Sequence, residues 1–144
     1  MKKMIMIVAV DLSFSATALA DDRPVDYNKL PAPAKEFVKQ YFPEDTVLGV
    51  SKDDDFVRPD YTVLLSGGAK IEFEHSGALE KISVRGASVP VAILPMQIAD
   101  YVKKNYSGAS VKEYEIGRAV YEVKLSNGLE LTFSSTFRLV DIDD

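Results

Sequence analysis

The chain has 144 residues, of which 27% are charged and 47% hydrophobic, a composition typical of one compact domain or two small repeated units. It contains no cysteine and one histidine, which excludes disulfides, thiolate zinc sites, iron–sulfur clusters and multi-histidine metal sites. We therefore expect no cofactor and no structural metal. The net charge is −5 and no basic stripe is present, which argues against a nucleic-acid partner because such binding rests on lysine and arginine at phosphates.

The first 20 residues have the pattern of a bacterial export signal. Two lysines precede the apolar run 4–10, and residues 18–20 have the Ala-Leu-Ala pattern that signal peptidase cleaves. The run is too short to span a bilayer and no later apolar stretch is long enough, so we expect no membrane anchor. The sequence predicts a signal peptide at 1–20, a mature chain beginning at Asp21, and a periplasmic or secreted protein.

The rest of the chain contains two copies of one unit, the first at 30–84 and the second at 94–144, with an extension at 21–29 and a linker at 85–93. Each copy begins with Leu-Pro followed by apolar residues at helical spacing, and an offset of 64 residues superimposes the two patterns. We predict an amphipathic helix there in each copy. The two stripes are Ala34, Phe37, Val38, Tyr41 and Phe42, and Ile98, Tyr101, Val102, Asn105 and Tyr106.

Each helix is followed by segments with the alternation of antiparallel strands. An offset of 60 residues aligns 61–82 with 121–142 and gives eight identities. Gly67-Gly68 and Asn127-Gly128 separate the strand pairs and predict tight type I′ turns. The predicted fold is α+β, with two tandem helix-plus-antiparallel-meander repeats and both helices packed on one face of an antiparallel sheet.

The second copy contains YEVKLSNGLELTF at Tyr121–Phe133, and the first contains the weaker counterpart YTVLLSGGAKIEF at 61–73. With the Leu-Pro start and helix of each copy, these segments resemble the PepSY-like family of small exported bacterial proteins, common among Bacteroidetes. The resemblance implies a fold likened to the β-lactamase inhibitor protein, a periplasmic location and a binding role, and it supplies no catalytic residues. Residues 134–137, Ser-Ser-Thr-Phe, replace the acidic, glycine-containing turn typical of the family, and we expect this hairpin tip to differ in shape.

Two further features of the sequence are candidate chemical sites. His75 lies at a predicted hairpin turn, and without a G-x-S-x-G elbow an exposed turn residue is favoured over a catalytic base. Asp53–Asp55 is the densest acidic run, within the loop 51–60 that the second copy shortens. Consecutive aspartates lack the alternate spacing of calcium loops, so a solvated loop is favoured, and a small-ligand or cation sensor using this loop is an alternative.

Polar residues of the predicted strands should share the sheet face opposite the helices. We predict a non-catalytic binding or inhibitory module that uses this polar face and the loops to contact a protein or peptide in the periplasm. A carboxylate-based hydrolase is a further alternative, disfavoured because the strand glutamates are expected to be exposed, without a pKa raised by burial. The candidate binding residues are Thr62, Lys70, Glu72, Glu74, Glu122, Lys124, Glu130 and Thr132.

Overall fold

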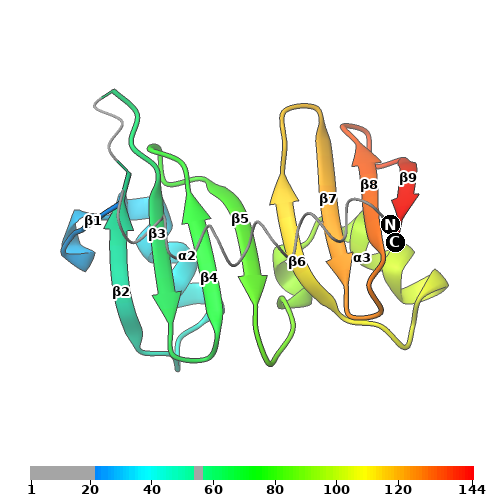
Figure 1. Ribbon diagram of the computed structural model, residues 1–144, viewed down its shortest axis with the longest axis horizontal. Coiled ribbons are helices and arrows are strands. Elements are labelled where there is room, and N and C mark those ends of the chain that lie inside the picture. The colour runs from blue at the N-terminus through cyan, green and yellow to red at the C-terminus, as the bar shows by residue number, and fades with distance from the viewer. Residues whose placement is uncertain (1–21, 54–56) are drawn as a thin grey trace.

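The computed structural model describes residues 22–53 and 57–144, so the predicted signal peptide, Asp54 and Asp55 lie outside the described residues. Within these ranges, nine strands form one antiparallel sheet whose order in space is their order in the sequence. Both α-helices pack on one face of the sheet (Figure 1), and no described element covers the other. The predicted α+β fold class is confirmed. Neither helix in this part of the chain is long and apolar enough to cross a membrane.

The same order of elements occurs twice in the described chain. The first half contains α2 (Ala32–Tyr41), β2 (Val47–Lys52), β3 (Tyr61–Leu65), β4 (Ala69–Phe73) and β5 (Leu79–Val84). The second half contains α3 (Met96–Asn105), β6 (Val111–Ile116), β7 (Val120–Leu125), β8 (Glu130–Ser134) and β9 (Leu139–Asp143). The other elements are the edge strand β1 (Arg23–Pro24) and two 3-10 turns, η1 (Tyr27–Lys29) and η2 (Val91–Ile93), one before each helix.

The two helices begin and end in the same way. Pro31 and Pro95 are their N-cap residues, with extended backbones at ψ of 147° and 141°. The helices end where the amides of Phe42 and Tyr106 donate to carbonyls four residues earlier, at 2.9 and 2.7 Å. Four helix residues are buried against the sheet, which agrees with the predicted stripes: Ala34, Val38, Ile98 and Val102.

The core lies between the helices and the sheet and has the same aromatic pair in each half. Phe73 in β4 and Phe133 in β8 are 0% and 1% exposed. Phe37 of α2 meets Phe73 edge-on with ring centroids 5.5 Å apart, and Tyr101 of α3 meets Phe133 at the same distance. Among the described residues, Tyr114 is the one buried residue whose side chain has a polar atom, and no charged side chain is buried. The polar chemistry of the described chain is therefore at its surface.

The halves join where β5 pairs with β6, so one sheet continues through both units. Lys81 on β5 forms an ion pair with Glu113 on β6, with Nζ and Oε1 3.7 Å apart. Ile82 is 0% exposed and its neighbour Tyr114 is 3% exposed, so the junction has an apolar centre. The three paired positions are Lys81 with Glu115, Ile82 with Tyr114, and Ser83 with Glu113.

The predicted type I′ hairpin turns are wrong. A type I′ turn needs two successive residues with positive φ, whereas at these turns only Gly68 and Gly128 have it, at +100° and +93°. Local bonding explains the difference in the second half. The side-chain oxygen of Asn127 accepts a hydrogen bond from the amide of Leu129 at 3.0 Å, which fixes a turn with one left-handed residue.

The tip of the last hairpin keeps the backbone of its counterpart in the first half, and its difference in shape from the turn typical of the family stays a prediction. Gly77 and Phe137 occupy equivalent places with φ of +93° and +66°. Their amides donate to Glu74 and Ser134 carbonyls at 2.8 and 2.9 Å. A phenylalanine with positive φ is strained, and here its ring stacks on Tyr121 with centroids 4.9 Å apart. We attribute the retained turn to this packing.

Candidate functional site

The sheet face opposite the helices, called the open face, carries the polar residues of both halves. Thr62 and Lys70 alternate with buried Val63 and Ile71, and the strands of the second half follow the same alternation. Seven of the predicted binding residues thus lie on this face, and Glu74 lies at its end, just past β4. The cross-strand pairs are Thr62 with Glu72, Leu64 with Lys70, Glu122 with Thr132, and Lys124 with Glu130.

Open-face residues form two continuous rows across the sheet, because the register carries each row from β2 to β9. One row contains Gly49, Leu64, Lys70, Ser83, Glu113, Lys124, Glu130 and Asp143. The other contains Ser51, Thr62, Glu72, Lys81, Glu115, Glu122, Thr132 and Asp141. In the second half these rows hold six carboxylates and one lysine, so its open face is acidic.

The glutamates of these rows are less exposed than the sequence suggested. Glu72, Glu122 and Glu130 are partly buried, and Glu74 is exposed. Side chains on adjacent strands are only about 5 Å apart, so each flanks its neighbour. Burial raises the pKa of Glu72, while Lys81 and Lys70 lower it. The expectation that no strand glutamate has a pKa raised by burial is therefore wrong.

A carboxyl pair that the sequence reasoning missed lies at one end of the open face. The side chains of Asp60 and Glu80 hydrogen-bond to each other. Burial raises the pKa of Glu80 to about 7, and the charges of Asp60, Glu72 and Glu74 add to this rise. Burial and the charge of Asp53 raise the pKa of Asp60, whereas its bond to Glu80 lowers it. Below about pH 7, Glu80 keeps its proton and can donate it in this hydrogen bond, with Asp60 as the acceptor.

A bulge in β5 brings the side chain of Glu80 to the open face, beside Asp60. In regular alternation with buried Ile82, Glu80 would face the helices, but the register shifts so that Leu79 pairs with Phe73. Asp60 is held by a reciprocal contact across the β2–β3 loop, where its amide donates to Asp53 Oδ1 at 3.3 Å and its carbonyl accepts from the Asp53 amide at 3.1 Å. The repeat alignment contained a signal for both carboxyls, because their counterparts are valines, Val120 and Val140.

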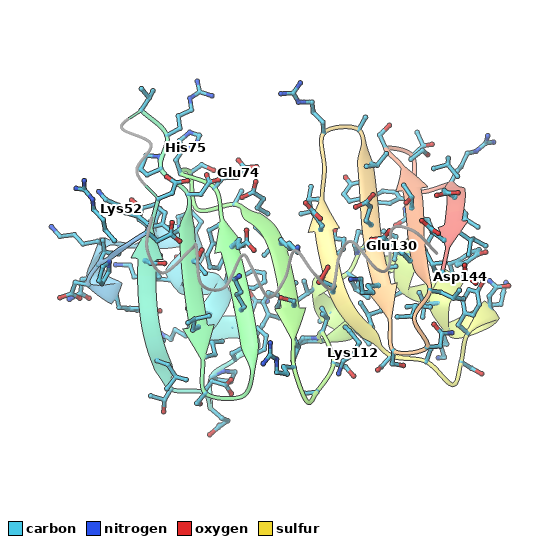
Figure 2. The ribbon with its side chains drawn as sticks, viewed as in Figure 1. Lys52, Glu74, His75, Lys112, Glu130 and Asp144 are labelled. Atoms are coloured by element: carbon cyan, nitrogen blue, oxygen red, sulfur yellow. The ribbon has the colours of Figure 1, made fainter. Side chains whose placement is uncertain are left out.

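The other candidate residues from the sequence are His75 and the run Asp53–Asp55. His75 is exposed in the turn between β4 and β5, beside Glu74 (Figure 2). Of the acidic run Asp53–Asp55, only Asp53 is described, and it contacts Asp60 as above. Among the described residues, no three histidine, aspartate or glutamate side chains are grouped to hold a metal ion.

Comparison with known families identifies the class. Residues 59–141 match the family described as "Putative beta-lactamase-inhibitor-like, PepSY-like". This match covers more than half of the chain, and the chain belongs to that family. The resemblance inferred from the segment Tyr121–Phe133 is thereby confirmed. No curated protein matches this chain.

Solved structures of Bacteroides proteins are similar over most of the chain. A "putative calcium-regulated periplasmic protein" from Bacteroides thetaiotaomicron is 40% identical, with a TM-score of 0.82, and the match covers 85% of this chain and 97% of that one. A "putative periplasmic protein" of the DUF2874 family from Bacteroides vulgatus is 37% identical, with a TM-score of 0.81, and the match covers 86% of this chain and 98% of that one. The predicted periplasmic location is confirmed by these relatives. Cleavage after Ala20 stays a prediction.

Proposed function

We propose that this protein is a non-catalytic binding module of the periplasm, which contacts a protein or peptide through its open face and the adjoining loops. The observation that supports this role is the pair of polar rows running from β2 to β9 on a face that no described element covers. A sheet with one apolar and one polar face needs only one covering layer, which the helices provide. No described element therefore covers the polar face, which supports a role in recognition.

Charge indicates the kind of partner. The six carboxylates of the second half stand in adjacent rows, and several of them are partly buried beside one another. Like charges at cross-strand positions are unfavourable, as at Glu115 with Glu122 and Glu130 with Asp143. A basic partner surface relieves this repulsion and is steered to the face during association. The expected partner therefore presents lysine or arginine.

The carboxyl pair supports binding better than hydrolysis. Glycosidases hold their two carboxyl groups about 5 Å or more apart so that the scissile bond or a water molecule fits between them. Asp60 and Glu80 instead hydrogen-bond directly to each other. Carboxyl groups in hydrogen-bond contact are closer together than this spacing.

Affinity capture from a periplasmic extract tests the binding role. The bait is the mature protein, compared with a Glu115→Lys, Glu122→Lys double variant of the open face. The matched control carries the same charge change on the helix side, at the exposed residues Glu36 and Asp100. We expect the open-face variant to lose a captured protein that the parent and control retain. Equal capture by all three folded proteins contradicts the proposal.

A second candidate function, response to calcium, has its own supporting observation. Asp60 and Glu80 are paired carboxyls, and a relative 40% identical is described as "putative calcium-regulated". Calcium prefers carboxylate oxygens and competes with the proton that Glu80 holds. Calcium should then raise Tm more at about pH 8 than at about pH 6, where Glu80 keeps its proton. Equal Tm in calcium and in chelator at both values, or an unchanged response in Glu80→Gln, contradicts this function.

A further inference from the structure

The two edges of the sheet differ in their capacity to accept another strand. The edge strand β1 has two residues, Arg23 and Pro24, and proline has no amide proton to donate. The opposite edge strand, β9 (Leu139–Asp143), has five residues and no proline (Figure 1). Short strands and proline are common protections of a sheet edge. The β1 edge has this protection and the β9 edge does not.

The first half shows how an edge of this kind is covered. Strand β5 is the counterpart of β9, and its outer side pairs with β6. Ile82 on β5 is 0% exposed because it lies beside Tyr114, whereas its counterpart Ile142 on β9 is 47% exposed. An isoleucine that is buried by the next strand in one half is thus uncovered in the other. The β5–β6 junction therefore provides a template for a strand on β9.

The charge is reversed at one of the two junction positions, and a negative charge is added at the other. At the place of Lys81, which faces Glu115, β9 has Asp141, and at the place of Ser83 it has Asp143. A strand docked on β9 in the register of the β5–β6 pair would have two side chains opposite Asp143 and Asp141. In β6 the side chains at these two positions are Glu113 and Glu115. Opposite charges favour such cross-strand pairs and like charges oppose them. The strand that fits β9 is therefore basic where β6 is acidic.

We propose that the β9 edge binds an extended segment of a partner protein as a tenth, antiparallel strand, with a basic–aromatic–basic pattern opposite Asp143, Ile142 and Asp141. Asp141 and Asp143 also end the open-face rows, but the proposed contact is backbone pairing along the edge of β9, so the controls for strand pairing can fail while the open-face function holds. Figure 2 labels Glu130 and Asp144 near this edge, which add to its negative charge.

A second copy of the chain does not suit this edge. Two antiparallel β9 strands would bring aspartates of both copies into one small patch, where like charges repel. The native β6 sequence, with Glu113 and Glu115, would meet the same repulsion. Charge thus selects a different, basic chain.

The test uses peptides derived from β6, Val111–Ile116. The probe carries Glu113→Lys and Glu115→Lys, the unmodified peptide is the charge control, and a probe with the further change Tyr114→Pro is the control for strand pairing. Binding to the isotopically labelled protein is followed by NMR chemical-shift changes. We expect the lysine probe to bind about tenfold more tightly than either control. The largest amide shifts should fall on β9.

Protein variants separate the edge from general attraction to an acidic surface. Asp141→Lys with Asp143→Lys should reverse the preference, so that the unmodified glutamate peptide binds more tightly. Glu122→Lys, also acidic but away from the edge, should keep the parental preference. Failure of any peptide to bind, as expected if the charges serve only to prevent aggregation, overturns the proposal. Shifts confined to β3 and β4, equal binding of the proline probe, or dimers of the protein formed through β9 also overturn it.

Discussion

The two halves have one frame and two different surfaces. Phe73 and Phe133 are buried in equivalent places, each under an aromatic ring of its own helix at 5.5 Å. On the open face, by contrast, the hydrogen-bonded pair Asp60 and Glu80 is replaced by valines in the second half. Helix-facing positions are constrained by close packing, whereas open-face positions tolerate a change of charge. Differences between the halves therefore mark where function can reside.

Loop length also differs between the halves without disturbing the register. Asp53 and Asp60 close the β2–β3 loop with an amide-to-carbonyl bond of 3.1 Å, and Gly117 and Val120 close the shorter β6–β7 turn with the same bond at 2.8 Å. The strands on either side of each loop pair in the same order in both halves. The extra residues of the longer loop therefore do not change the pairing of the strands. Long loops cost little free energy once their ends are fixed.

The largest expected effect comes from placing a charge in either helix interface. Val38 and Val102 are 4% and 7% exposed, so Val38→Asp or Val102→Asp buries an unpaired carboxylate and should cost about 4 kcal/mol. Each variant should therefore lose a large share of its stability, because such domains have an unfolding free energy of only about 5–15 kcal/mol. Urea unfolding followed by circular dichroism measures this. Met96→Asp, at a position 74% exposed on α3, is the control and should fold normally.

A second comparison uses the equivalent isoleucines at the outer strands of each half. Ile82 is 0% exposed and Ile142 is 47% exposed. Ile82→Ala should therefore cost about 3 kcal/mol of unfolding free energy, and Ile142→Ala about 1 kcal/mol or less. Parallel denaturant titrations compare the two. Equal losses would mean that the β9 edge is covered in solution.

A smaller effect is a pH dependence confined to the first half. Because the folded-state pKa of Glu80 is raised from 4.5 to about 7, the folded protein binds a proton more tightly than the unfolded chain. Its stabilising contribution is complete below the unfolded pKa and is lost as pH rises through about 7, and solvent screening reduces it to about 1 kcal/mol. Unfolding free energy should fall over this range in the parent and in Glu36→Gln, and less in Glu80→Gln. The same slope in all three would contradict the assignment.

The smallest effect on stability is expected on the open face. Glu122→Lys replaces a partly buried carboxylate that lies opposite Glu115, so one like-charge contact is removed while some packing is disturbed. The net change should be about 0.5 kcal/mol. Thermal melting measures it. A loss as large as that of Val102→Asp would place this side chain in the core.

The alternation of apolar residues predicted the strands, and their helical spacing predicted the helices, because burial is periodic along both kinds of element. The residues of the stripes that are buried, such as Val38 and Val102, were correctly placed on the helices, and the polar row residues on the opposite face. The position of Glu80 on the open face was not predicted, because a bulge changes the direction in which its side chain points. The positive φ of Phe137 was not predicted either, because it depends on stacking against Tyr121, a residue distant in the sequence.

The open face as the binding surface is tested most directly by lysine acetylation of the captured complex, read by mass spectrometry. Lys70 and Lys124 lie on the open face, while Lys39, Lys103 and Lys104 are exposed on the helices. We expect the bound partner to slow acetylation of Lys70 and Lys124 and to leave the helix lysines reacting as in the free protein. Protection of the helix lysines with Lys70 and Lys124 unchanged would contradict it.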